Sequence, residues 1–111
     1  MALPKDYRLN KNEFKRVFEQ GKTVKSSFFF INFLKNNSGH LRLAVSVPNK
    51  ISKKATVRNR IRRAVVEAVQ KNNFVAQPLD LVIITTEVIV GKAAKEIKRE
   101  IEKTIDKIFV N

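Results

Sequence analysis

Cysteine is absent from the chain of 111 residues, and histidine occurs once, at His40. Without cysteine the protein can form no disulfide and can use no thiolate as a nucleophile. One histidine without cysteine is also a poor basis for a zinc site, which is normally built from several such ligands. We therefore expect no metal held by the protein itself, and we interpret His40, in a predicted turn, as solvated.

Long apolar runs are also absent. The first residues, MALPKDYRLNK, contain proline and charges where a secretory signal peptide needs an apolar stretch. The longest apolar stretch, Leu79–Val90, is too short and too polar to cross a bilayer. These absences predict a soluble, cytoplasmic protein. Apolar residues make up 43% of the chain, so its length predicts a single folded domain over residues 1–111.

Acidic residues are scarce, above all in the first 63 positions. The chain has 23 Lys and Arg against 10 Asp and Glu, a net charge of +13. Sixteen of the basic residues but only three acids lie in residues 1–63, whereas residues 64–111 carry seven of each sign. Solubility requires no such segregation, so this excess predicts a polyanionic partner. Nucleic acid is the first candidate, and an anionic membrane surface is the rival.

Hydrophobic periodicity predicts an α+β fold in which helices pack on a small sheet. Asn10 and Glu13 have the spacing of a capping box at the start of the first helix, and Gly21 is a typical stop. Thr56 is the predicted N-cap of the second helix. The expected order is helix, strand, strand, helix, strand, helix, over residues 11–20, 23–34, 41–47, 57–71, 79–86 and 92–109.

Aromatic residues gather in the first helix and the first strand. Phe14, Val17 and Phe18 form one apolar face of the helix. The strand over residues 23–34 is apolar on both faces, so it is either covered on both sides or borders a groove. Most such side chains belong to a core. The alternative is a groove in which exposed aromatics stack the unpaired bases of a single strand.

The sharpest feature is a basic cluster that leads into the second helix. Helical spacing places Arg58 and Arg62 at one edge of the apolar stripe and Arg60 at the other, while Asn59 and Arg63 point away. Cations at a helix N-terminus oppose the helix dipole, and an ordinary solvated face would carry both signs. Arginine grips phosphate through paired hydrogen bonds, so the cluster predicts salt-dependent RNA binding. Its basic residues, with no acid among them, are Lys50, Lys53, Lys54, Arg58, Arg60, Arg62 and Arg63.

Around Arg58-Asn59-Arg60, continuing as Ile61-Arg62-Arg63, the sequence resembles the protein subunit of bacterial ribonuclease P. The similarity extends over nearly the whole chain. Its further segments, in the expected order, are Tyr7-Arg8-Leu9, Phe14-Lys15-Arg16-Val17-Phe18, Leu41–Val47 and Leu79–Ile84.

The resemblance implies a non-catalytic subunit of an endoribonuclease that removes the 5′ leader from precursor tRNA. The RNA subunit and its magnesium ions would perform the chemistry, with no DNA and no membrane as partner. The implied fold is a ribosomal-protein-like sandwich with a mixed sheet and a left-handed β-α-β crossover. The residues implied in docking on the RNA subunit are Lys53, Lys54, Arg58, Asn59, Arg60, Arg62 and Arg63. Those expected in the leader-binding cleft are Phe14, Phe18, Lys50 and Arg8.

Three places on the leader side differ from the family pattern. Asn32 stands where an aromatic residue is usual, Asn49-Lys50 replaces a basic pair, and Thr85-Thr86-Glu87 replaces a basic segment.

Three other classes remain as alternatives. A structural RNA-binding protein, such as a ribosomal one, would share the basic helix without needing a leader cleft. A stand-alone nuclease would need several converging carboxylates, of which the basic half of the chain has too few. A membrane-surface helix would carry large apolar residues such as Leu or Trp opposite its charges, whereas the stripe here is Val, Ile and Ala.

Overall fold

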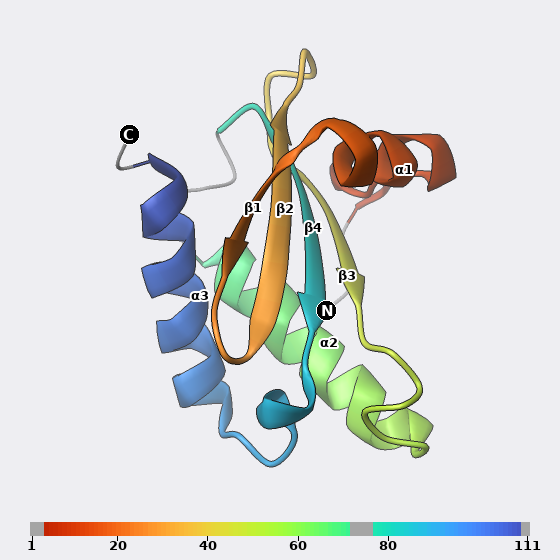
Figure 1. The fold of residues 1–111 in the computed structure, drawn as a ribbon, viewed down its shortest axis with the longest axis vertical. Coiled ribbons are helices and arrows are strands. Elements are labelled where there is room, and N and C mark those ends of the chain that lie inside the picture. Colours follow the sequence, from red (N-terminus) through yellow and green to blue (C-terminus); the bar gives the residue numbers. More distant parts are fainter. Residues whose placement is uncertain (1–3, 72–76, 110–111) are drawn as a thin grey trace.

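The computed structural model describes residues 4–71 and 77–109, and it contains three α-helices and a four-stranded sheet (Figure 1). The helices are α1 (Lys11–Gln20), α2 (Ala55–Gln70) and α3 (Ala94–Phe109), with short 3-10 helices η1 (Lys5–Tyr7) and η3 (Glu87–Ile89). The strands are β1 (Lys22–Lys25), β2 (Phe29–Lys35), β3 (Arg42–Ser46) and β4 (Leu79–Thr85).

The sheet is mixed, with the strand order β1-β2-β4-β3. The β1–β2 and β2–β4 pairs are antiparallel, and β3 and β4 are parallel neighbours. In Figure 1 these two strands run downwards with β3 to the right of β4, and α2 connects them behind the sheet. This connection is left-handed, against the strong right-handed preference of such crossovers. The expected mixed sheet and left-handed crossover are confirmed.

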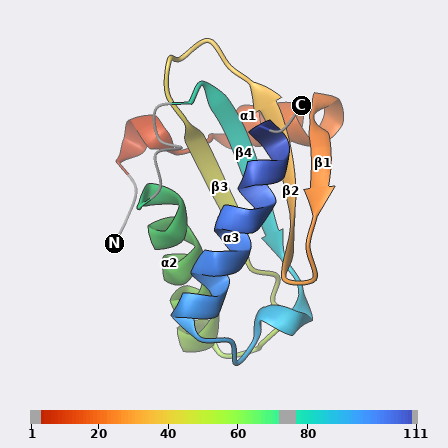
Figure 2. The ribbon, with the colours of Figure 1, turned by 90° about the vertical axis from the view of Figure 1, so that its left-hand side faces the viewer.

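Helices cover the two faces of the sheet unequally. Both α2 and α3 pack on one face, side by side, and α1 lies across the other face (Figure 2). On the α1 side Val17 is fully buried against β2 and β4. The main core lies on the α2–α3 side and includes Phe29, Ile31, Leu43, Leu81, Ile83, Ile61, Val65, Ile97, Ile101 and Ile105.

The predicted single strand over residues 23–34 was wrong, because the structure contains two strands there. The backbone N–H of Ser26 donates to the carbonyl of Phe29 at 2.9 Å, and the Ser26 hydroxyl accepts from the N–H of Phe28 at 3.0 Å. A serine side chain that bonds nearby backbone in this way closes a turn. Aromatic and β-branched residues are typical of any strand, so the composition of this segment does not distinguish one long strand from a hairpin of two.

The helix starts were predicted with mixed success. The capping box of α1 is present, with the Asn10 and Glu13 side chains accepting from each other's backbone N–H groups at 2.8 and 2.9 Å. The N-cap of α2 is Lys54 and not Thr56, and it has no side-chain cap. Instead, the Lys54 carbonyl accepts from the N–H groups of Val57 and Arg58. The last helix begins two residues later than predicted, after a turn at Gly91 with φ of 82°.

Candidate RNA-binding surfaces

The first candidate surface lies at the start of α2. Ile61 and Val65 are buried in the core, so the other sides of the helix face outwards. Arg58 and Arg62 are half-buried at the edge of this apolar stripe, as the helical spacing predicted. The remaining members are exposed. We call this surface the α2 basic surface, and its members are Lys53, Lys54, Arg58, Asn59, Arg60, Arg62 and Arg63.

Two arginines of the α2 basic surface have partners within the protein. Arg58 Nη1 donates to the carbonyl oxygen of Ser52 at 2.8 Å, which ties the preceding loop to the helix. Arg62 Nη1 donates to Asn59 Oδ1 at 2.8 Å, which leaves the amide NH₂ of Asn59 as its outward donor. Among the described residues, no acid pairs with any cation of this surface. The surface therefore presents concentrated, uncompensated positive charge.

The second candidate surface is aromatic and lies on α1. The rings of Phe14 and Phe18 meet edge to face with their centroids 5.7 Å apart. Phe14 is half-buried, whereas Phe18 is 54% exposed, which is unusual for a large apolar side chain that only fills a core. More than half of the Phe18 side chain is therefore accessible to a ligand.

Phe30 is an exposed aromatic residue that sequence reasoning did not single out. It lies on β2, is 38% exposed, and has the ammonium of Lys25 5.7 Å from its ring centroid. Lys25 is its cross-strand partner, which could be recognised only once the β1–β2 hairpin was known. Asn32, two residues further along the strand, is instead buried and accepts a hydrogen bond from the Thr23 hydroxyl at 2.6 Å.

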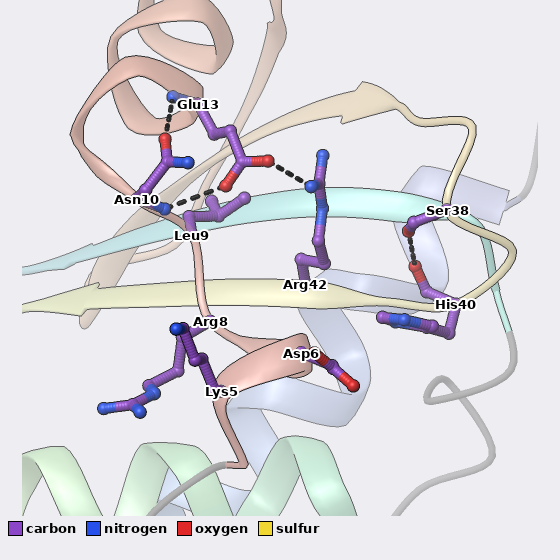
Figure 3. A pocket seen from close by; sticks show the side chains of 9 residues that line it. All are labelled: Lys5, Asp6, Arg8, Leu9, Asn10, Glu13, Ser38, His40 and Arg42. Atoms are coloured by element: carbon purple, nitrogen blue, oxygen red, sulfur yellow. Dashed lines mark hydrogen bonds and ion pairs between the residues drawn. The ribbon is translucent and has the colours of Figure 1, made fainter.

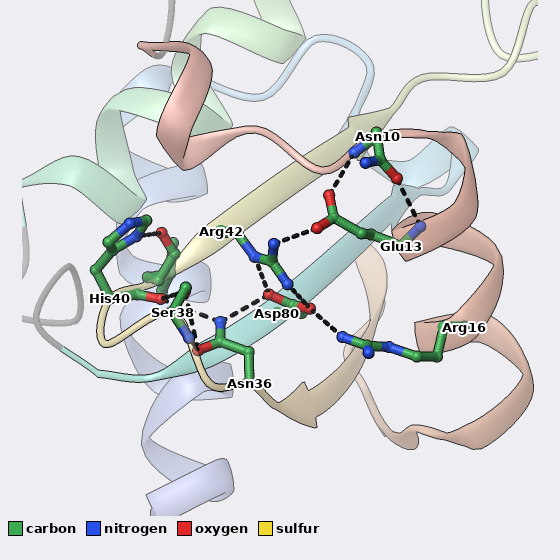
Figure 4. Close-up of polar contacts among 9 residues, drawn as sticks. Asn10, Glu13, Arg16, Asn36, Ser38, His40, Arg42 and Asp80 are labelled. Carbon is green, nitrogen blue, oxygen red and sulfur yellow. Dashed lines mark hydrogen bonds and ion pairs between the residues drawn. The ribbon is translucent and has the colours of Figure 1, made fainter.

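A network of charged side chains fixes α1 to the sheet (Figure 4). Asp80 is fully buried and receives hydrogen bonds from Arg42 at 2.8 Å (twice), from Asn36 at 2.7 Å and from Arg16 at 3.3 Å. Arg42 also donates to the capping-box residue Glu13. The hydrogen bond to Asp80 is the main cause that raises the pKa of Arg42 above its ordinary value. Sequence reasoning missed this network. The sequence feature that could have indicated it is Asp80, an acidic residue within the largely apolar strand β4.

The two remaining residues of the predicted leader cleft, Arg8 and Lys50, lie apart from the α1 aromatics. Arg8 lines a pocket between the N-terminal arm and the β2–β3 turn, together with Glu13 and His40 (Figure 3). Lys50 is exposed in the turn that follows β3. The structure therefore groups Phe14 with Phe18 but places the two cations at separate positions.

The described residues contain no group of three or more His, Asp or Glu side chains that could hold a metal ion. Carboxylates such as Glu13 and Asp80 are engaged with arginines. Within the described helices, none combines the length and the apolar character needed to cross a membrane.

Comparison with known proteins agrees with this geometry. The family model for ribonuclease P matches residues 3–109. The chain belongs to the bacterial ribonuclease P protein family. The ribonuclease P protein component of Staphylococcus haemolyticus is 31% identical to it over 112 residues, which cover 96% of both chains.

Solved ribonuclease P proteins have the same fold. A mutant RNase P protein of Staphylococcus aureus is 28% identical, with a TM-score of 0.85 over 96% of this chain and 92% of that one. The RNase P protein of Thermotoga maritima, 24% identical, superposes with a TM-score of 0.82 over 90% of this chain and 96% of that one. The fold class expected from the resemblance is confirmed.

As a ribonuclease P protein, the chain is a component of an endoribonuclease holoenzyme and assists the ribonuclease P RNA in 5′ processing of precursor tRNA. An RNA subunit is therefore its implied partner. The rival readings as a stand-alone nuclease, a ribosomal protein or a membrane-surface protein are set aside by this membership.

Proposed function

We propose that this ribonuclease P protein docks on the RNA subunit through the α2 basic surface. The observation that carries the proposal is the set of exposed cations, Lys53, Lys54, Arg60 and Arg63, that pair with no acid among the described residues. Clustered positive charges repel one another and so destabilise the isolated fold. The same charges favour binding to RNA phosphates, because binding releases the counterions of the RNA. Arg58 and Arg62, held by Ser52 and Asn59, keep the loop and the helix surface in shape for this contact.

The same proposal places the 5′ leader of precursor tRNA against α1. Phe18 offers an exposed ring, and Phe14 supports it from the side. Arg8 and Lys50, both exposed but apart from these rings, would contact more distant phosphates of the leader. Aromatic stacking tolerates any base, so this contact would supply affinity with little sequence preference.

The chemistry in this proposal belongs to the RNA subunit and its magnesium ions. The protein raises substrate affinity by offsetting phosphate repulsion between the leader and the catalytic RNA. This activity would take place in the cytoplasm, with RNA as the only polyanionic partner.

Reconstitution tests the proposal. The chain is mixed with a bacterial ribonuclease P RNA at low magnesium, and precursor-tRNA cleavage is followed against the RNA alone. We expect the protein to stimulate cleavage and to be inactive by itself. Absence of stimulation would contradict the docking proposal, and cleavage by the protein alone would contradict the division of labour.

A further inference from the structure

A second basic surface lies between α2 and α3, on the face of the sheet opposite α1. The two helices pack side by side there (Figure 2) and leave a groove of about 300 Å³ between their outer sides. Lys71 of α2 and Lys95 and Lys98 of α3 line it, and all three side chains are exposed. Among the described residues of its lining, Glu67 is the one acid. Three lysines and one carboxylate thus border this groove among the described residues.

Acids stand at helical spacing from two of these lysines, Glu67 four residues before Lys71 and Glu102 four after Lys98, but neither forms an ion pair with its lysine. On α3, Lys95 is three residues before Lys98 and four before Arg99, and like charges at these helical spacings repel. Within the described residues, none of the three groove lysines has an ion-pair partner. The neutral total charge of residues 64–111 thus conceals a local excess of positive charge on one side of α3.

The groove continues the α2 basic surface. Arg60, Ala64, Glu67 and Lys71 follow one another at spacings of four, three and four residues, so they form a single stripe along α2. With a rise of 1.5 Å per residue, the stripe runs for about 16 Å from the exposed Arg60 to Lys71. A polyanion bound at Arg60 that follows the helix axis would reach the groove without leaving the protein surface.

Short side chains also line the groove. They are Ala64 and Ala68 of α2 and Ala94 of α3. Because these methyl groups occupy little space, a phosphate group could approach the helix surfaces closely with an ammonium on either side. Lysine acts as a flexible point charge, and phosphate contacts carry no sequence information, so the surface suits a phosphate backbone of any sequence.

We propose that the α2–α3 groove binds the phosphate backbone of the RNA subunit, through Lys71, Lys95 and Lys98, as an extension of the α2 basic surface. This inference rests on the proposed docking of α2 on that RNA. It adds a sequence-independent contact on α3, a helix with no other assigned part in RNA binding. The contact contributes affinity and salt dependence, and leaves recognition of the leader to α1.

The test compares two double variants with equal charge loss on the same helix. Lys95→Ala with Lys98→Ala removes the α3 side of the groove. Lys103→Ala with Lys107→Ala removes two exposed lysines from the flank of α3 that turns away from α2. Binding of each full-length variant to a bacterial ribonuclease P RNA is measured over a series of salt concentrations, and melting temperatures check that both remain folded.

We expect the groove variant to bind the RNA roughly tenfold more weakly, and its slope of log K against log salt to fall by about 1 to 2, one unit for each lost phosphate contact. The control variant should change both quantities much less. Equal effects of the two variants would overturn the groove proposal, since only total charge would then matter.

Two further outcomes separate this proposal from the one on which it rests. If the unchanged protein does not bind the RNA subunit, the docking proposal fails. If the groove variant binds that RNA normally but the assembled holoenzyme binds precursor tRNA more weakly, the groove contacts the substrate and the present assignment is wrong.

Discussion

Arg42 donates two parallel hydrogen bonds to Asp80, from Nε to Oδ1 and from Nη2 to Oδ2, each 2.8 Å long. The carboxylate is fully buried, and the pair joins the adjacent strands β3 and β4. Through Glu13 and Arg16 the same pair reaches α1, which carries the exposed Phe18. The position of the proposed leader-binding aromatics therefore depends on charged groups at the other side of their helix.

The first prediction concerns the removal of Arg42. Replacing it by methionine keeps the length of the side chain but leaves the Asp80 carboxylate buried with only Asn36 and Arg16 as donors. Breaking one side of a buried ion pair costs about 3–5 kcal/mol. We expect Arg42→Met to lower the free energy of unfolding in urea by an amount in this range. Arg99→Met, at an exposed position on α3, should lower it by less than about 0.5 kcal/mol, and equal losses would contradict the role of the pair.

The second prediction concerns pH. The pKa of Arg42 is raised on folding, chiefly by the hydrogen bond to Asp80. A raised pKa means that the stabilisation is complete below the unfolded value and is lost only as the pH rises through the still higher folded value. The stability difference between the wild type and Arg42→Met should therefore stay constant from about pH 7 to about pH 10. Urea titrations measure this difference in the free energy of unfolding. If it shrinks between these pH values, the titration of another group weakens the Arg42–Asp80 pair.

The third prediction separates binding from folding within the α2 basic surface. Arg60 is exposed and has no partner among the described residues, so Arg60→Ala should leave the melting temperature unchanged. Its Kd for the RNA subunit should rise roughly tenfold, with a shallower salt dependence. Arg58→Ala is the informative contrast, because Arg58 holds the carbonyl of Ser52 and its loss should lower stability as well. A collapse of the melting temperature in Arg60→Ala would show that Arg60 is structural.

The fourth prediction concerns the leader contact at Phe18. Stacking of a base on an aromatic ring contributes about 1–3 kcal/mol. In the holoenzyme, Phe18→Ala should therefore weaken binding of leader-bearing precursor tRNA by roughly 5-fold to 150-fold, and binding of mature tRNA much less. Stability should change little, because the ring is 54% exposed. Equal losses for the two RNAs would mean that Phe18 only supports Phe14 and the fold.

Phe29→Ala provides a contrast at the same kind of residue. Phe29 is fully buried in the core between the sheet and the helices. Its truncation should lower the free energy of unfolding by about 3–5 kcal/mol, measured in urea, without a preference between the two RNAs.

Sequence alone determined several of the features that depend on neighbours along the chain, although not the N-cap of α2 or the turn at Ser26. The capping box of α1 joins residues three positions apart, and the order of charges on α2 follows from the helical period once the apolar stripe of Ile61 and Val65 is recognised. The Arg58-Asn59-Arg60 core was sufficient to point to the family. Local hydrogen bonds and helical spacing are encoded in short segments, which is why these predictions were correct.

Tertiary structure decided every feature that joins distant segments. Asp80 meets Arg42 and Arg16 only because β4 lies beside β3 and packs against α1, and Lys71 and Lys95 line one groove only because α2 packs on α3. The same holds for neighbouring phenylalanines of β2. The packing of the sheet buries Phe29 and leaves Phe30 exposed. Burial and charge convergence depend on which surfaces pack together, and the local pattern of residues does not contain that information.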